Sequence, residues 1–105
     1  MEFAKTVIRL CKDVKQSVIN RELVSQLVRA AGSIGANYRE ASEALSRKDF
    51  GHRVKIARKE ASEAHYWLQL LKEADADSSN LVDPLLQEAR ELRNILTAIA
   101  KKVEQ

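Results

Sequence analysis

Apolar residues recur at alternating steps of three and four along four stretches of this chain. The clearest stretch covers residues 46–74, where the apolar positions are Phe50, Val54, Ala57, Ala61, Ala64, Leu68 and Leu71. A period near 3.6 residues places such side chains along one side of a helix. Similar stripes predict further helices over residues 2–16, 20–45 and 83–103. We therefore expect an all-α protein.

The other three stripes define the rest of the expected core. Their positions are Phe3, Val7, Leu10 and Val14 in the first helix, Leu23, Leu27, Ala30, Ile34, Tyr38, Ala41 and Leu45 in the second, and Leu85, Ala89, Leu92, Leu96, Ile99 and Val103 in the fourth. No linker or internal repeat divides the chain, and the links between helices are short. Short links favour antiparallel neighbours, so we predict one domain over residues 1–105, folded as an antiparallel up-down four-helix bundle.

Polar residues at the boundaries indicate where the helices end. Ser46 is a candidate N-cap because its hydroxyl can accept a hydrogen bond from a first-turn amide, and Asp49 suits the positive end of that helix. Asp83 before Pro84 fits the start of the fourth helix, since proline is tolerated at the first helical position. A start near residues 79–80 is the alternative.

Gly32 and Gly35 lie inside the second predicted helix. Each costs about 1 kcal/mol relative to alanine in a helix interior, which indicates a bend or a close backbone contact there. The apolar period continues in phase through Ile34 and Ala41. We therefore expect one bent helix, and two helices broken at Gly32 are the alternative.

Apolar residues outside the main stripes form a second seam on the second and third helices. Its members are Val24, Val28, Ala31, Ile56, Trp67 and Leu70. An isolated bundle would cover them poorly, and tryptophan is favoured in interfaces because it buries a large area. We predict a homo-oligomer whose interface contains Val24, Val28, Ile56, Trp67 and Leu70. The alternative is a wide core face with Trp67 at a bundle edge.

Composition narrows the class of protein further. No apolar run approaches the ~20 residues that span a bilayer, and the N-terminus lacks the basic and apolar regions of a signal peptide. We therefore expect no membrane association and a cytoplasmic location. Cys11 is the only cysteine, so an intrachain disulfide is excluded, and its place on the apolar side of the first helix indicates a small core residue.

Positive charge is concentrated in the first half of the chain. Residues 1–60 hold 13 Lys and Arg against 7 Asp and Glu, whereas residues 61–105 hold 5 against 8. Lys48, His52, Lys55 and Lys59 recur at helical steps opposite the apolar stripe, and we call these four residues the basic ridge. A local excess of this kind attracts phosphate-rich polymers. The alternative is a solvated face that keeps the protein soluble.

The sequence offers no motif for catalysis, nucleotide binding or metal binding. GxGxxG, HExxH and the phosphate-binding loop pattern are all missing. His52 and His65 lie about 20 Å apart along one helix, too far to share a metal within one subunit. We predict no enzyme, no cofactor and no metal, and we expect His65 at the surface.

Asn37, Glu40 and Glu63 are polar residues of interest, and Asn37 lies close to the predicted core seam of the second helix. Asn37 follows the two glycines closely, and a buried amide without a partner would cost about 1–3 kcal/mol. It can bond a carbonyl freed by the bend or reach Glu63 on the next helix. We expect a structural role, because polar contacts of this kind fix helix register.

Two ordered blocks of the chain resemble a known bacterial family. Residues 29–41, which read RAAGSIGANYREA, resemble the SI-x-AN-x-x-E core of the four-helix-bundle proteins encoded by intervening sequences in ribosomal RNA genes. Residues 48–50, 55–63 and 66–71 resemble the second block of that family. The resemblance implies a bundle that assembles into a ring, commonly a pentamer. Many members carry proline where this chain has Gly35.

The chain is also similar to the accessory proteins of diversity-generating retroelements, whose basic pentamers bind nucleic acid and a reverse transcriptase. This similarity implies that a reverse transcriptase is one candidate partner. It also implies that Asn37, Glu40 and Glu63 belong to a structural signature.

The leading prediction is a non-enzymatic homo-oligomer that binds RNA or DNA through its basic surface. The residues expected to meet phosphates, without reading bases, are Arg47, Lys48, His52, Lys55, Arg58 and Lys59. The rival is a protein-interaction scaffold that docks a partner through the second seam or a ring surface. A small enzyme working through Glu40 or Glu63 is a third hypothesis.

Overall fold

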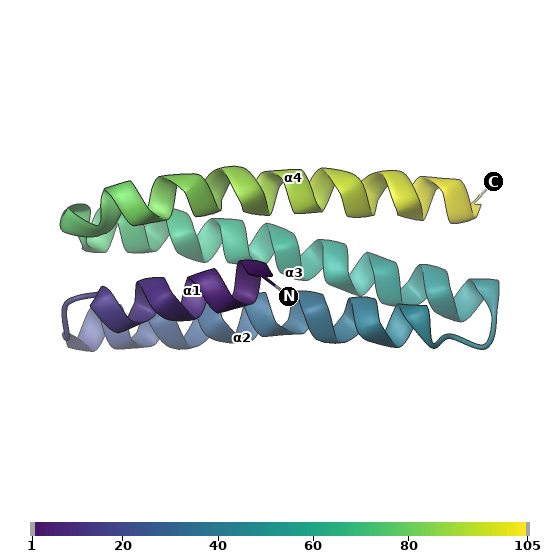
Figure 1. Ribbon diagram of the computed structural model, residues 1–105, viewed down its shortest axis with the longest axis horizontal. Helices are drawn as coiled ribbons and strands as arrows, with labels where there is room; N and C mark the ends of the chain where they lie inside the picture. Colours follow the sequence, from purple (N-terminus) through teal and green to yellow (C-terminus); the bar gives the residue numbers. More distant parts are fainter. Residues whose placement is uncertain (1, 105) are drawn as a thin grey trace.

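The computed structural model describes residues 2–104 and contains four α-helices joined by short links (Figure 1). In chain order they are α1 (Glu2–Asp13), α2 (Val18–Ser42), α3 (Arg47–Ala74) and α4 (Ser79–Glu104), with a 3-10 turn, η1 (Ala76–Ser78), before α4. No strand occurs within the described residues. The all-helical prediction is confirmed, and the two end residues of the predicted 1–105 domain lie outside the described part.

The helices run up and down beside one another in a rod of 44 × 19 × 19 Å (Figure 1). α3 packs against both α2 and α4, and α1 contacts the same two helices. The 28 residues of α3 reach about 42 Å, nearly the full length of the rod, whereas the 12 residues of α1 reach about 18 Å. α1 therefore covers one half of the rod, and the other half consists of three helices.

The core follows the apolar stripe of α3. The buried residues of this helix are Gly51, Val54, Ala57, Ala61, Ala64, Leu68 and Leu71. The small alanines let the neighbouring helices approach, while Phe3, Leu27 and Leu85 supply bulk as some of the largest fully buried side chains. Burying a side chain such as Leu or Phe stabilises the fold by about 1.5–3 kcal/mol. The predicted seam of α3 is correct from Val54 to Leu71.

The buried seam of α3 begins at Gly51 rather than at Phe50. Phe50 is half-buried, whereas Gly51 is buried. A Cβ added to Gly51 would lie 3.0 Å from Val103 Cγ1, closer than ordinary van der Waals contact. The missing side chain lets the start of α3 pack closely on the end of α4, a tertiary constraint that the apolar period alone does not reveal.

Serine hydroxyls cap two of the helices. Ser46 Oγ accepts a hydrogen bond from the Asp49 amide at 3.0 Å, which confirms the predicted N-cap of α3. Ser17 Oγ accepts one from the Asn20 amide at 3.0 Å and begins α2. α1 ends at Asp13, short of the predicted residue 16, because the chain turns before the cap at Ser17.

α4 begins at Ser79, so the predicted start at Asp83 is wrong and the alternative start near residues 79–80 is correct. Val82 is fully buried, and its contribution to the core favours the longer helix. Pro84 lies inside α4, where it removes one hydrogen bond to a carbonyl near the helix start.

Asp75 organises the link that leads into α4. Its carbonyl accepts hydrogen bonds from the Ser78 amide at 3.1 Å and from Ser78 Oγ at 2.8 Å. Its carboxylate accepts one from the Lys15 amide at 3.2 Å. These bonds tie the link between α3 and α4 to the link between α1 and α2, at the four-helix end of the rod.

α2 is one continuous helix through both glycines, so the two-helix alternative is wrong. The space around Gly32 is open, and no close contact accounts for the glycine there. α2 ends at Ser42 rather than at the predicted residue 45. Tyr38 and Leu45 are exposed, not in the core as predicted, because α1 does not reach Tyr38 and Leu45 lies in the link after α2.

Candidate nucleic-acid interface

The basic ridge lies along the outer side of α3, in the half of the rod that has three helices (Figure 1). Lys48, His52, Lys55 and Lys59 are all exposed. Their steps of four and three keep them on one side of the helix, over about 16 Å from first to last. Arg58 is half-buried. The ridge therefore faces outward, as the sequence predicted.

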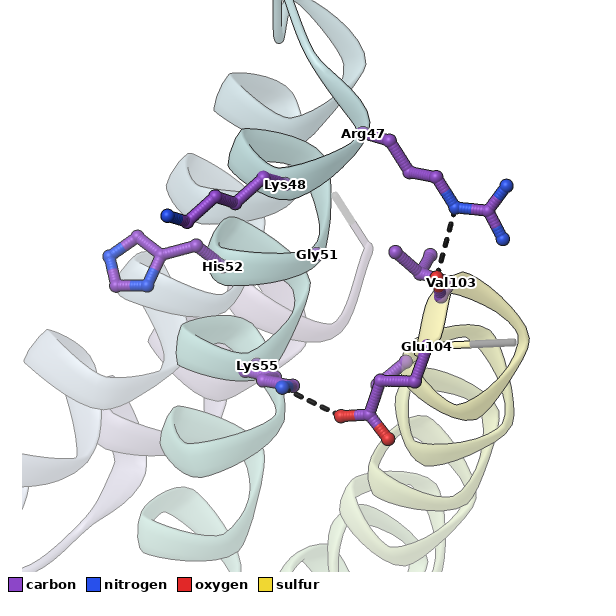
Figure 2. Close-up of a pocket in the computed structure, with 8 residues that line it drawn as sticks. Arg47, Lys48, Gly51, His52, Lys55, Val103 and Glu104 are labelled. Carbon is purple, nitrogen blue, oxygen red and sulfur yellow. Dashed lines mark hydrogen bonds and ion pairs between the residues drawn. The ribbon is translucent and has the colours of Figure 1, made fainter.

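A pocket of about 580 Å³ lies where the ridge meets the end of α4 (Figure 2). α3 contributes Arg47, Lys48, Gly51, His52 and Lys55 to its lining, and α4 contributes Ala100, Val103 and Glu104. In Figure 2, Lys48 and His52 point away from α4, whereas Arg47 reaches over the last turn of α4. The volume falls in the range of small-ligand sites, and one carboxylate lies among several basic groups.

Arg47 holds the last turn of α4. Its Nε donates a hydrogen bond to the Val103 carbonyl at 2.9 Å, and its Nη2 donates one to the Lys102 carbonyl at 3.1 Å. The last carbonyls of a helix have no partner within the helix, so the guanidinium satisfies two of them. Arg47 is one of the predicted phosphate contacts, and a phosphate would have to share it with these carbonyls.

Lys55 is paired with Glu104, the last residue of α4. Lys55 Nζ lies 2.6 Å from Glu104 Oε1, with the two side chains 46% and 58% exposed. The hydrogen bond from Lys55 and then its charge lower the pKa of the Glu104 carboxyl, and Arg58 adds to the effect. Lys48 and Lys59, by contrast, form no ion pair with any residue that the structure describes.

A second charged cluster bridges α2 and α3. Arg29 Nη1 lies 3.4 Å from Glu60 Oε2, and its Nη2 lies 3.8 Å from Glu63 Oε1. Glu60 Oε1 is buried, and the part of the chain described here gives it no hydrogen-bond partner. Sequence reasoning placed Glu63 near Asn37, but the carboxylate contacts Arg29 instead. Glu40 is exposed on α2.

Asn37 forms a local bond and a bond across helices. Its Nδ2 donates to the Ser33 carbonyl at 2.9 Å, one turn earlier in α2. Its Oδ1 accepts from Arg53 Nη1 of α3 at 3.4 Å. A bond from Asn37 to a carbonyl is present as predicted, but this carbonyl belongs to Ser33 within the continuous helix α2, and a bend that frees it stays a prediction. The predicted bond to Glu63 is wrong, because Arg53 lies opposite Asn37.

The second seam is more covered than the sequence predicts. Val24, Ile56, Trp67 and Leu70 are half-buried, and Val28 is 37% exposed. Ala31, expected in the seam, is 1% exposed and belongs to the core. Trp67 packs against the core and meets Tyr66 edge-on at 5.1 Å between ring centroids. Trp67 Nε1 is buried and has no partner among the described residues.

Sequence reasoning missed an apolar groove between α2 and α4. The groove has a volume of about 280 Å³ and is lined by Ile34, Gly35, Tyr38, Arg39, Leu92, Ile95, Leu96 and Ile99. It lies in the half of the rod that α1 does not reach, and Tyr38 and Ile95 are 47% and 56% exposed. The signal was the length of the first apolar stripe, which is too short to cover two longer helices.

Cys11 and His65 lie outside the basic ridge and are both partly buried. Cys11 is half-buried, and burial raises the pKa of its thiol to about 11, so the thiol is protonated at neutral pH. His65 lies at the surface only in part, because the residue is half-buried and its Nε2 is buried. The described residues contain no cluster of metal-ligating side chains, and none of the described helices has the length and apolar character needed to cross a membrane.

Comparison with known proteins identifies the family. Residues 1–98 match the family described as 23S rRNA-intervening sequence protein. The chain belongs to this family. A crystal structure from Bacteroides thetaiotaomicron, described as a protein of unknown function from the S23 ribosomal protein family, superposes with a TM-score of 0.83. It is 36% identical in sequence, and the match covers 95% of this chain and 93% of that one.

The family assignment agrees with the resemblance read from the two sequence blocks. The 23S rRNA-intervening sequence protein family and the structure from Bacteroides thetaiotaomicron together support the all-helical fold. No curated protein sequence matches the chain.

Proposed function

We propose that this 23S rRNA-intervening sequence protein is a non-enzymatic homo-oligomer that binds RNA or other nucleic acid through the basic ridge. The observation that carries the proposal is the outward row of Lys48, His52, Lys55 and Lys59 on α3. Lysines in such a row meet phosphates as point charges, and phosphate contacts hold a nucleic acid without reading its sequence.

Oligomerisation strengthens this weak surface. Each chain carries a formal net charge of only +3, and linked copies of a site bind a polymer more tightly than one copy does. Val28 and the half-buried residues Val24, Ile56, Trp67 and Leu70 are the proposed contacts between copies. A pentamer is the assembly that we propose from the family resemblance, and mass measurement of the native assembly tests it.

The test is salt-dependent binding to short RNA and DNA duplexes and single strands, measured by fluorescence anisotropy. Affinity should fall steeply between 50 and 200 mM salt, because bound lysines release counterions from the phosphates. The double variant Lys48→Glu with Lys59→Glu should abolish binding. The matched control is Lys12→Glu with Lys15→Glu, an identical change of charge at the other end of the rod, which should weaken binding far less. Equal losses in both double variants would contradict a role for the ridge.

The apolar groove between α2 and α4 favours a second candidate function, the docking of a protein partner. Tyr38 and Ile95 expose large apolar surfaces there, and grooves of this kind receive amphipathic helices. A reverse transcriptase is a candidate partner by family resemblance. Tyr38→Glu and Ile95→Glu should abolish capture of such a partner while leaving nucleic-acid affinity unchanged, whereas the ridge variants should do the reverse.

A further inference from the structure

We propose that Glu104 is a built-in competitor of the basic ridge: its carboxylate occupies the place at Lys55 that a nucleic-acid phosphate takes in the complex. This inference rests on the proposed function and adds a regulator to the same surface. It assigns a role to Glu104, an exposed residue at the end of α4 that does not contribute to the core.

The contact between the two residues is short and open to solvent. Lys55 Nζ and Glu104 Oε1 are 2.6 Å apart, and both side chains are about half exposed. Exposed ion pairs of this type are held weakly, because water and salt compete with them. A phosphate can therefore displace the carboxylate without unfolding any part of the rod.

Glu104 remains negatively charged in the unbound protein. The hydrogen bond from Lys55 lowers the pKa of its carboxyl, so the carboxylate persists through the neutral range. A carboxylate carries one negative charge, as a phosphodiester does. The pair therefore neutralises Lys55 before the nucleic acid arrives, and Lys55 gains a phosphate only when Glu104 leaves.

Two contacts place the last turn of α4 beside the ridge. Arg47 donates hydrogen bonds to the Lys102 and Val103 carbonyls. Gly51 lets Val103 approach α3, since a Cβ there would lie 3.0 Å from Val103 Cγ1. With the backbone held at two points, the Glu104 side chain lies at the rim of the basic pocket, next to Lys55 (Figure 2).

The structure supplies a matched control pair. Lys72 Nζ and Asp83 Oδ1 lie 2.7 Å apart, join the same two helices and are 44% and 54% exposed. This pair lies at the other end of α3, away from the ridge. Glu104→Gln and Asp83→Asn each remove one negative charge and one exposed ion pair between the same two helices, one beside the ridge and one away from it.

The experiment measures binding of a fluorescein-labelled single-stranded RNA to the wild-type chain and both variants, over 50 to 200 mM salt. Glu104→Gln should tighten binding by up to about fivefold, the factor that corresponds to an exposed ion pair. The slope of log affinity against log salt should stay nearly the same, because Lys55 contacts one phosphate in both complexes. Asp83→Asn should change affinity by less than about twofold.

A further variant tests whether Glu104 acts through Lys55. In a Lys55→Gln background, Glu104→Gln should give no gain in affinity. If wild type and Glu104→Gln bind equally well, or if both charge-removing variants tighten binding equally, the competitor role is overturned while the proposed function stands. If neither this RNA nor a DNA strand of the same sequence binds to any of these proteins at any salt concentration, the proposed function and this inference both fall.

Discussion

Gly51 of α3 and Val103 of α4 lie so close together that a side chain at residue 51 would crowd Val103. The ideal Cβ position at Gly51 lies 3.0 Å from Val103 Cγ1. Arg47 binds the carbonyl of the same Val103 from one turn earlier in α3. The close packing of Val103 on Gly51 and the hydrogen bond from Arg47 therefore both hold the end of α4 against the start of α3.

Alanine substitution at Gly32 and at Gly51 should separate the effect of helix propensity from that of packing, because only Gly51 has a close neighbour. Gly32→Ala should raise the free energy of unfolding by about 0.5–1 kcal/mol, because the helix gains alanine in open space. Gly51→Ala should be less stable than Gly32→Ala by about 1–3 kcal/mol, the cost of overpacking against Val103. Urea denaturation measures both. Equal stabilisation by the two changes would contradict the close approach at Gly51.

Removal of the N-cap at Ser46 should lower the stability of the protein. Ser46→Ala removes the acceptor for the Asp49 amide and should lower the free energy of unfolding by about 1 kcal/mol. Ser62→Ala is the control, since Ser62 is an exposed residue inside α3, and alanine there should stabilise slightly. Thermal and urea denaturation of the two variants should move in opposite directions, and movement in the same direction would count against the cap.

Two leucines predicted in the core should respond very differently to truncation. Leu68 is fully buried in α3, whereas Leu45 in the link after α2 is fully exposed. Leu68→Ala should lower the free energy of unfolding by about 2–5 kcal/mol, and Leu45→Ala should change it by less than about 0.5 kcal/mol. A comparable loss at Leu45 would show that a further surface covers it, and the measurement should then be repeated across protein concentrations.

His65 should make stability sensitive to mild acid. Burial first, and then Arg90 and Arg93, lower the pKa of its imidazole from 6.5. The folded state therefore takes up a proton less readily than the unfolded chain. The contribution of neutral His65 to the free energy of unfolding is therefore complete above pH 6.5 and is lost as the pH falls through and below that value. His65→Gln should lose less stability than wild type between pH 7 and pH 5, and identical losses would contradict this assignment.

The sequence predicted those features that repeat along one helix. The seam from Val54 to Leu71 and the outward face of Lys48 and Lys59 follow from the helical period alone. The cap at Ser46 was also predictable from the sequence, because its hydrogen bond joins Ser46 to a residue only three positions away. Such features depend on local geometry, which a single sequence carries.

Features that depend on distant residues could not be read in this way. Lys55 meets Glu104, and Arg47 meets Val103, across more than forty positions of chain. The start of α4 depends on the burial of Val82. A periodic pattern specifies which face of a helix is apolar, but it does not specify how far along the helix a neighbour extends. Tyr38 was misplaced for that reason.

Because α1 is short, four helices pack together at one end of the rod and three at the other. One end of the rod has a fourth helix and the Asp75 bonds to hold it, whereas the end with Lys48 and Lys59 relies on three helices. Regions with fewer buried contacts open more often, so backbone amides near the ridge should exchange with deuterium sooner than those around Leu68. A nucleic acid bound along α3 would stabilise this three-helix end, and its binding should slow hydrogen–deuterium exchange of the backbone amides there.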